Sequence, residues 1–323
     1  MKKVLLIMPE FYDYEKEIIE ELHKKYAVDF IKMYPVNIFI IILIKALKKI
    51  FKNFEVKFYY FYFKFLLKSK YNKKYDYILV INGENIGENL ILDLKNNYLN
   101  KIGKMILHIW TPISRYPILE KTYKLYDRIS SFEKEDCKKY GLIFRTNFYS
   151  SILDEIKQNN KKIIYDFIFV GQFRLERYLF IKNFMQLNNN GFYYLYHNFF
   201  TFIIFKIIKK EYRNISFKDL KFKQLSRKNM YELMQKSKCI LDDTDVNQNG
   251  LTQRIFDALY LEKKIITTNK KIKEYEFYNK NNIFVINSQN IIIDRDFFTK
   301  EFLKEMDLNS YSLENWCKDV IGE

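Results

Sequence analysis

Cysteine and histidine are both scarce in this chain, with three residues of each type among 323. Cys137, Cys239 and Cys317 are odd in number and far apart, so they form neither a disulfide framework nor the paired spacing of a zinc site. Three scattered histidines argue against a histidine-based metal centre. We therefore expect reduced thiols and a cytoplasmic setting.

Glycine and proline are also rare, at eight and four residues, and long apolar runs are missing. No uninterrupted run reaches the roughly 18 apolar residues of a membrane-spanning helix, so none is required. The start, MKKVLLIMPE, has an apolar run too short for a secretory signal, because it reaches Pro9 and Glu10 at once. We interpret this run as the first strand of a sheet.

Positive charge is in excess, with a formal net charge of +16. Lysine is abundant together with asparagine, isoleucine, tyrosine and phenylalanine, and because all five have AT-rich codons, genome composition explains part of the excess. The rest still implies attraction to anions, whether nucleic acid, acidic lipid or phosphorylated substrates. The lysines are scattered and no nucleic-acid-binding motif accompanies them, so we do not expect a nucleic-acid partner.

Strand and helix signals alternate through both halves of the chain, which indicates parallel sheets covered by helices. The strands expected in the first half are Val4–Met8, Val28–Lys32, Tyr77–Ile81, Met105–Trp110 and Arg128–Ser131. Those expected in the second half are Asp166–Val170, Tyr193–Tyr196, Ile215–Phe217, a strand ending at Leu241, Lys264–Thr268 and Ile283–Ile286. A polar, basic break at 158–162 separates the halves. We predict an α/β fold of two Rossmann-like doubly wound domains, residues 1–158 and 159–323.

The stretch Ile240–Asn269 is the most informative part of the chain about function. A strand ends, a polar loop follows, and a helix begins just after Gly250, which lets the backbone approach a ligand closely. A helix that starts there favours anions, because its free N–H groups and its dipole both attract negative charge. Arg254 in the first turns suits a diphosphate, and Asp257 is placed one turn further on to hold a ribose diol.

Two nearby features have competing interpretations. Asp243 and Asp245 form an Asp-x-Asp pair of the kind that can bind Mg²⁺ or Mn²⁺ on a nucleotide. We favour a site without metal, because Arg254 and the helix dipole can neutralise the phosphates. The turn from Gly171 to Arg174 is either a second loop facing the diphosphate or a tight turn with a solvated arginine.

The same stretch resembles the donor-binding half of GT-B glycosyltransferases, and more closely bacterial lipopolysaccharide-core and capsule transferases of the rhamnosyltransferase type. The residues that carry the resemblance are Asp242, Gln248, Gly250, Leu251, Thr252, Arg254, Asp257, Lys263, Lys264, Ile266, Thr267, Thr268, Asn269, Phe277, Tyr278, Asn279, Asn282 and Ile283. It extends over roughly 75–287. Family members usually have glutamate where this chain has Asp257.

The resemblance implies a central cleft between the domains and a nucleotide-sugar as substrate. We expect no cofactor and no requirement for a divalent metal. The donor-binding residues it implies, together with the turn described above, are Gly171, Arg174, Gln248, Gly250, Leu251, Thr252, Arg254, Asp257, Thr268 and Asn269.

The first domain is expected to supply a general base that takes the proton of the acceptor hydroxyl. Relatives often carry an acidic residue after the tryptophan that corresponds to Trp110, whereas this chain has Thr111, so the base has to come from elsewhere. We favour Glu84, in a glycine-flanked loop after a strand, and keep His108 as a second candidate that is more often a packed strand residue. Trp110 and Arg115 form either an acceptor platform or core packing.

Two apolar segments, Asn37–Lys70 and Phe192–Lys210, are also aromatic and basic. Each can lie in the interface of an anionic membrane or be a buried crossover with lysines reaching out to solvent.

We therefore expect a glycosyltransferase that moves a hexosyl or deoxyhexosyl group from a nucleotide-sugar to a lipopolysaccharide, capsule or other glycan or lipid-linked acceptor. Its setting is cytoplasmic or peripheral on the inner face of the membrane. The alternatives are a catalytically inactive GT-B relative that assists glycan assembly and a basic nucleic-acid-binding protein.

Overall fold

The computed structural model describes residues 1–35, 40, 44, 47, 50–51, 54–159, 161–188, 190–245, 247–304 and 307–323. The chain forms two compact units, one made of residues 1–146 with 310–323 and the other of residues 147–309. These limits differ from the predicted boundary at 158/159. The segment 147–158 packs with the second unit, and the end of the chain returns to the first.

The first unit is built on a six-stranded parallel sheet in the order β2-β1-β3-β4-β5-β6. Its strands are β1 (Lys3–Met8), β2 (Ala27–Lys32), β3 (Tyr75–Ile81), β4 (Leu99–Ile109), β5 (Arg128–Ser131) and β6 (Ile143–Phe144). The apolar runs of β1, β3 and β4 are buried, as expected for central strands covered on both faces.

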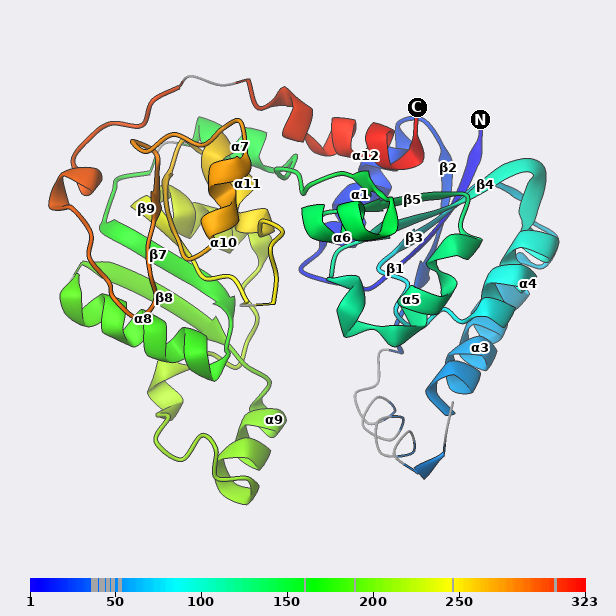
Figure 1. Cartoon of the computed structure of the whole chain (residues 1–323), viewed down its shortest axis with the longest axis horizontal. Helices are drawn as coiled ribbons and strands as arrows, with labels where there is room; N and C mark the ends of the chain where they lie inside the picture. Colours follow the sequence, from blue (N-terminus) through cyan, green and yellow to red (C-terminus); the bar gives the residue numbers. More distant parts are fainter. Residues whose placement is uncertain are drawn as a thin grey trace. The chain divides into compact units, whose positions relative to one another are not determined.

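Apart from the last one, the helices of this unit lie between its strands in the sequence (Figure 1). They are α1 (Tyr14–His23), α3 (Phe54–Leu67), α4 (Glu88–Tyr98), α5 (Pro117–Thr122), α6 (Lys134–Tyr140) and the final α12 (Leu313–Ile321). Helix α3 buries Tyr59, Phe63 and Leu67 and exposes Phe61 and Phe65, so this part of the aromatic segment has both a packed and an open side. The apolar run 38–44 before it lies outside the described residues, apart from Ile40 and Ile44.

The second unit has a five-stranded parallel sheet in the order β11-β10-β9-β7-β8. Its strands are β7 (Tyr165–Gln172), β8 (Gly191–Tyr196), β9 (Ser237–Asp242), β10 (Lys264–Thr267) and β11 (Ile283–Val285). Its helices include α7 (Leu153–Gln158), α8 (Leu175–Leu187), α9 (Phe199–Ile203), α10 (Arg227–Gln235) and α11 (Gln253–Tyr260). The predicted strand Ile215–Phe217 is wrong: the Ile215 side chain is buried, but its amide donates to Tyr212 in a turn, and Phe217 begins a short 3-10 helix.

Each sheet reverses its direction of winding beside its first strand. In the first unit, β2 and β3 lie on opposite sides of β1, and in the second unit, β8 and β9 lie on opposite sides of β7. The loops after β1 and β3, and those after β7 and β9, therefore leave the carboxyl edge of their sheet in opposite directions. This is where doubly wound sheets bind their ligands. Among the described residues no helix combines the length and apolarity needed to cross a membrane.

Helix α12 belongs to the first unit because of what it buries there. Trp316 is fully buried, with its ring 5.0 Å from that of His108 and 5.7 Å from that of Trp110. The Arg128 side chain donates to the backbone oxygens of Asp319 and Val320 and so satisfies carbonyls at the end of the helix. The last helix thus completes the core over β4 and β5.

Replacing Trp316 by alanine should lower the free energy of unfolding of the first unit by about 3–5 kcal/mol, the usual cost of removing a buried tryptophan. Both tryptophans of the chain, at 110 and 316, lie in this unit, so the fluorescence of Trp110 reports its unfolding in urea. Glu314→Ala, on the exposed side of α12, is the matched control and should change it by no more than about 0.5 kcal/mol. Equal midpoints for the two variants would contradict this account of α12.

Candidate active site

The predicted donor-binding segments meet at the carboxyl edge of the second sheet. Gly171 and Arg174 lie at the end of β7, Asp242 ends β9, and Thr268 and Asn269 follow β10. Since β7, β9 and β10 are adjacent and parallel, their carboxyl ends lie side by side. The structure thus brings together residues that are up to about a hundred positions apart in the sequence.

The carboxylate of Asp242 is the centre of this edge. It is fully buried, and one oxygen accepts hydrogen bonds from the Thr252 hydroxyl at 2.7 Å and from the guanidinium of Arg254. The other oxygen accepts from the hydroxyls of Thr267 at 2.8 Å and Thr244 at 3.2 Å. A buried carboxylate needs such partners, and by bonding to them Asp242 fixes the start of α11 against β10.

Arg254 is held in place from three sides. Besides Asp242, its guanidinium donates to the backbone oxygen of Val170 at 2.9 Å and lies 4.7 Å from the centre of the Phe169 ring. A side chain at Gly171 would bring its Cβ to 3.1 Å from an Arg254 nitrogen and 2.9 Å from the Phe169 ring. A residue without a side chain at the end of β7 therefore leaves room for the arginine to cross the edge of the sheet.

A second cluster of arginines and aspartates adjoins Arg254. Arg174, at the start of α8, pairs with Asp243 at 2.9 Å and with Asp245 at 2.5 Å. Arg177, one turn further along α8, also pairs with Asp243 at 2.9 Å and donates to its backbone oxygen at 2.8 Å. Burial, together with the charges of Arg254 and Arg174, lowers the pKa of Arg177.

Arg177 was missed by the sequence analysis. The signal was available, because a basic residue three positions after Arg174 lies on the same face of a helix. The Asp-x-Asp pair, Asp243 and Asp245, is engaged by these arginines, and the described residues hold no cluster of histidine, cysteine and acidic side chains suited to a metal ion.

The remaining predicted donor residues shape the loop before α11. The Gln248 amide donates to the oxygen of Gly250, and the oxygen of Leu251 accepts from Asn147. The Asn269 amide donates to the oxygen of Asn249 at 3.1 Å, which ties this loop to the end of β10. The loop also bonds to Thr268, just after β10, whose hydroxyl accepts from the Thr244 amide at 3.2 Å.

Asp257 has a different position from the one expected. It is fully buried, and its two oxygens accept from the Ser150 amide at 3.0 Å and from the Tyr231 hydroxyl at 3.1 Å. Arg227, also buried, donates in turn to the Tyr231 hydroxyl. Asp257 therefore ties α10 and the segment before α7 to α11, and its burial argues against the predicted contact with a ribose diol.

In the first unit, the loop after β3 presents a buried carboxyl group. Asn82 and Gly83 both have a left-handed backbone with φ of 73°, so the chain turns sharply at the end of the strand and places Glu84 at the point where the winding reverses. The Asn82 side chain accepts from the amide of Trp110 at 2.8 Å and fixes this turn to the end of β4.

Glu84 is only 6% exposed. One carboxyl oxygen accepts a hydrogen bond from the Tyr34 hydroxyl, and the other is buried with no hydrogen-bond partner among the described residues. Burial raises the pKa of Glu84, and the bond from Tyr34 partly opposes this. A carboxyl group with a raised pKa and a spare oxygen is a suitable acid or base. Tyr34 was not singled out from the sequence, because it lies 50 positions away.

His108 is a core residue, which corrects its candidacy as a catalytic base. It is fully buried beneath α12, with Nδ1 2.8 Å from the Ser130 hydroxyl and the ring packed against Trp316. Burial lowers the pKa of His108 to about 3, and the charge of Arg145 acts in the same direction. The imidazole is therefore neutral at physiological pH and has no route to a substrate.

The two predicted acceptor residues, Trp110 and Arg115, differ in their surroundings. Trp110 packs its ring against Trp316 and lies 6.1 Å from the ring of Tyr14. It therefore takes part in the contact between α1 and α12, which agrees with the alternative of core packing. Arg115 lies in a short 3-10 helix and is exposed.

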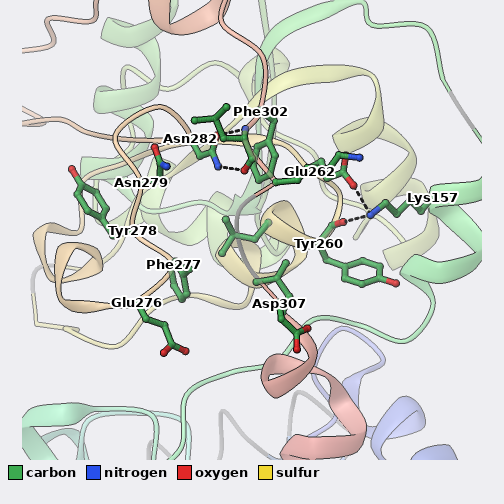
Figure 2. A pocket seen from close by; sticks show the side chains of 14 residues that line it. Lys157, Tyr260, Glu262, Glu276, Phe277, Tyr278, Asn279, Asn282, Phe302 and Asp307 are labelled. Atoms are coloured by element: carbon green, nitrogen blue, oxygen red, sulfur yellow. Dashed lines mark hydrogen bonds and ion pairs between the residues drawn. The ribbon is translucent and has the colours of Figure 1, made fainter.

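A cavity of about 410 Å³ lies elsewhere in the second unit (Figure 2). It is lined by the end of α11, residues before β11 and the segment around Leu303, at the amino edge of the sheet. Glu262 on its wall pairs with Lys157 at 2.8 Å and Lys304 at 2.6 Å. Of the predicted donor-binding residues, none lines this cavity.

Solved structures with a similar fold include enzymes of sugar metabolism. The chain is similar over its full length to sucrose-phosphate synthase from Thermosynechococcus elongatus, with a TM-score of 0.54, 11% identity and 94% of that chain covered. It is similar to UDP-GlcNAc 2-epimerase from Methanocaldococcus jannaschii, with a TM-score of 0.52, 12% identity, and 99% and 98% of the two chains covered.

A third similar structure is Anabaena HepE in complex with UDP and glucose, with a TM-score of 0.50, 9% identity, and 100% and 97% of the two chains covered. The chain has the GT-B fold. At these identities the likeness establishes the fold and leaves activity to the residues. No protein-family model matches the chain, and no curated protein matches its sequence.

The buried His108 predicts a pH dependence of stability. Its pKa is about 3 in the folded chain and about 6.5 when unfolded, so the unfolded state binds the proton first. As pH falls below about 6.5, this group should lower the free energy of unfolding of the first unit by about 1.4 kcal/mol per pH unit. Urea titrations followed by tryptophan fluorescence measure this slope, which should be reduced in His108→Asn and unchanged in the control His23→Asn, an exposed histidine.

Proposed function

We propose that this protein is a glycosyltransferase that moves a hexosyl or deoxyhexosyl group from a nucleotide-sugar to a glycan acceptor. The observation that carries the proposal is the convergence of Arg174, Arg177 and Arg254 at the carboxyl edge of the second sheet, where its winding reverses. Three guanidinium groups beside the starts of α8 and α11 form a site that suits a diphosphate. The UDP and glucose bound in one similar structure, and the UDP-GlcNAc for which another similar enzyme is named, support the same class of substrate.

Binding of the donor is proposed to exchange one set of ion pairs for another. The diphosphate takes the place of the Asp243 and Asp245 carboxylates on Arg174 and Arg177, while Arg254 stays fixed to Asp242 and presents its remaining N–H groups. Because the arginines supply the positive charge, we propose that the donor site needs no divalent metal and that the enzyme uses no cofactor.

Glu84 is proposed to act on the acceptor. The unpartnered oxygen of Glu84 takes the proton from an acceptor hydroxyl. At the same time the oxygen of that hydroxyl attacks the anomeric carbon, and the nucleoside diphosphate leaves with the bonding electrons. The hydrogen bond from Tyr34 holds the carboxyl group in position and favours its ionised form.

The acceptor is proposed to be a lipopolysaccharide, capsule or other lipid-linked glycan at the inner face of the cytoplasmic membrane. The resemblance of the 240–287 region to transferases of that kind supports this choice. The exposed Phe61 and Phe65 of α3, with exposed lysines Lys57 and Lys68 on and beside the helix, give further support for contact with an anionic surface.

A second candidate is a sugar-nucleotide epimerase, favoured by the similarity to the M. jannaschii enzyme. An epimerase changes its sugar nucleotide with no acceptor present, whereas a transferase releases the nucleotide only when the sugar moves. An inactive relative would bind the nucleotide and do neither.

The proposal is tested first by the thermal stability of the protein with UDP, GDP, CMP and dTDP, each with and without Mg²⁺. A nucleotide at a hundred times its Kd adds about 2.7 kcal/mol, a shift in Tm of roughly 5–10 °C for a unit of this size. One nucleotide should give this shift equally in both conditions. If none does, the donor site is wrong, and if the shift requires Mg²⁺, the metal-independent site is wrong.

Arg254→Ala should weaken binding of that nucleotide by about 1.5–3 kcal/mol, or roughly 10- to 150-fold in Kd by calorimetry. Because this change leaves Asp242 buried without its ion pair, Arg254→Lys is the second variant: it keeps the charge and loses the paired hydrogen bonds. Arg213→Ala, an exposed arginine of the same unit, is the matched control and should bind normally. Unchanged affinity in both Arg254 variants removes this residue from the site.

Glu84→Gln should lower kcat by roughly 10²–10⁴-fold with the Kd for the nucleotide unchanged, because the base is lost and the donor site is not touched. In the wild type, kcat should rise with pH through the raised pKa of Glu84. Tyr34→Phe should move this rise to higher pH, because the carboxylate loses a donor that stabilises it. A pH profile that does not move in Tyr34→Phe contradicts this role for Tyr34, and full activity in Glu84→Gln removes Glu84 as the base.

A further inference from the structure

Helix α9 continues without a break into a π-helical turn, η4 (Ile204–Ile208), and Figure 1 shows this element standing away from the sheet of the second unit. One side of it is anchored. Phe202 is fully buried, with its ring 5.1 Å from that of Phe217 and 5.5 Å from that of Phe222. The Lys206 ammonium donates to the backbone oxygens of Tyr212, Arg213 and Ile215, which fastens the turn to the following loop.

The opposite side of the same element is apolar and open to solvent. Phe200, Ile204, Ile207 and Ile208 expose 70%, 41%, 64% and 73% of their surface. Their spacing of four, seven and eight positions places them along one face of a helix. Folding of the unit does not bury this stripe. An apolar stripe that stays exposed on a surface commonly marks a site of interaction.

Positive charge surrounds the stripe. Residues 198–223 contain seven basic and two acidic side chains. Of the two acids, Asp219 accepts from the hydroxyls of Tyr178 and Tyr193 and pairs with Lys182, so it is turned toward the body of the unit. The exposed cations Lys209 and Lys210 directly follow the stripe. The Lys209 ammonium lies 4.0 Å from the centre of the Phe205 ring, at the border between the apolar and the charged sides.

We propose that α9 and η4 insert their apolar stripe into the surface of an anionic lipid bilayer, with Lys209 and Lys210 on the headgroup phosphates. A helical face of phenylalanine and isoleucine bordered by lysine fits a membrane interface, whereas the centres of protein interfaces are depleted in lysine. A second copy of the chain is a poor occupant, because two such basic faces repel each other.

This inference deepens the proposed function, on which it rests for its setting, by assigning membrane contact to a particular element of the donor-binding unit. Binding to vesicles needs no donor and no acceptor. Loss of vesicle binding with normal nucleotide binding, or the reverse, therefore shows which of the two proposals has failed.

The test is flotation of the full chain with vesicles of phosphatidylcholine, alone or mixed with phosphatidylglycerol. The wild type should float with the anionic vesicles. The triple variant Phe200→Ser, Ile207→Ser, Ile208→Ser should lose about tenfold or more in partition coefficient, because apolar surface no longer enters the bilayer. The matched control Leu179→Ser with Leu187→Ser removes exposed leucines of α8, 52% and 62% exposed, and should float like the wild type.

A second variant separates charge from apolar contact. Lys209→Gln with Lys210→Gln should weaken binding to anionic vesicles by roughly fivefold per lysine and reduce its sensitivity to salt. The nucleotide-induced shift in Tm, retained in each variant, shows that the unit still folds.

Three results would overturn the proposal: no flotation of the wild type, unchanged flotation of the triple variant, and a dimer that light scattering finds in the wild type and not in the triple variant. The second result would assign membrane contact to another surface such as α3. The third would assign the stripe to a second copy of the chain.

Discussion

The buried carboxylate of Asp242 organises the candidate donor site. Ending β9 with a charge that has no access to water is unfavourable unless donors surround it, and Thr252, Thr267 and Arg254 supply them. These bonds fix the start of α11, the end of β10 and the direction of the arginine. Because Arg254 is held in this way, it needs little further ordering to meet an anion, and Gly171 leaves the space that it crosses.

Both units have the same arrangement of strands around their first strand, but different side chains at the carboxyl edge of the sheet. In each, the first strand lies inside its sheet, so the loops after it and after a neighbouring strand separate at the carboxyl edge. The second unit fills this edge with paired arginines and aspartates, which suits a charged substrate. The first unit places Glu84 there, with a raised pKa, which suits proton transfer from a neutral hydroxyl.

Several charged or aromatic side chains that look alike in the sequence differ in what surrounds them. Arg254 lies at the edge of the sheet, whereas Asp257, three positions later on the same helix, is turned inward to Ser150 and Tyr231. Phe202 is buried and Phe200 is not, although both belong to one short helix. A helix has two sides, and which of them meets the core depends on the neighbouring elements.

The sequence by itself determined the two parallel α/β units, nearly all of their strands, and the loops that meet at the donor edge, because alternating apolar periods and glycine turns are local signals. The cluster of Gly250, Thr252 and Arg254 was found for the same reason. Only the tertiary structure decided that His108 is covered by α12, that Tyr34 reaches Glu84 and that Arg177 pairs with Asp243. These contacts join residues from 50 to more than 200 positions apart, and burial, which shifts their pKa values, exists only after the chain has folded.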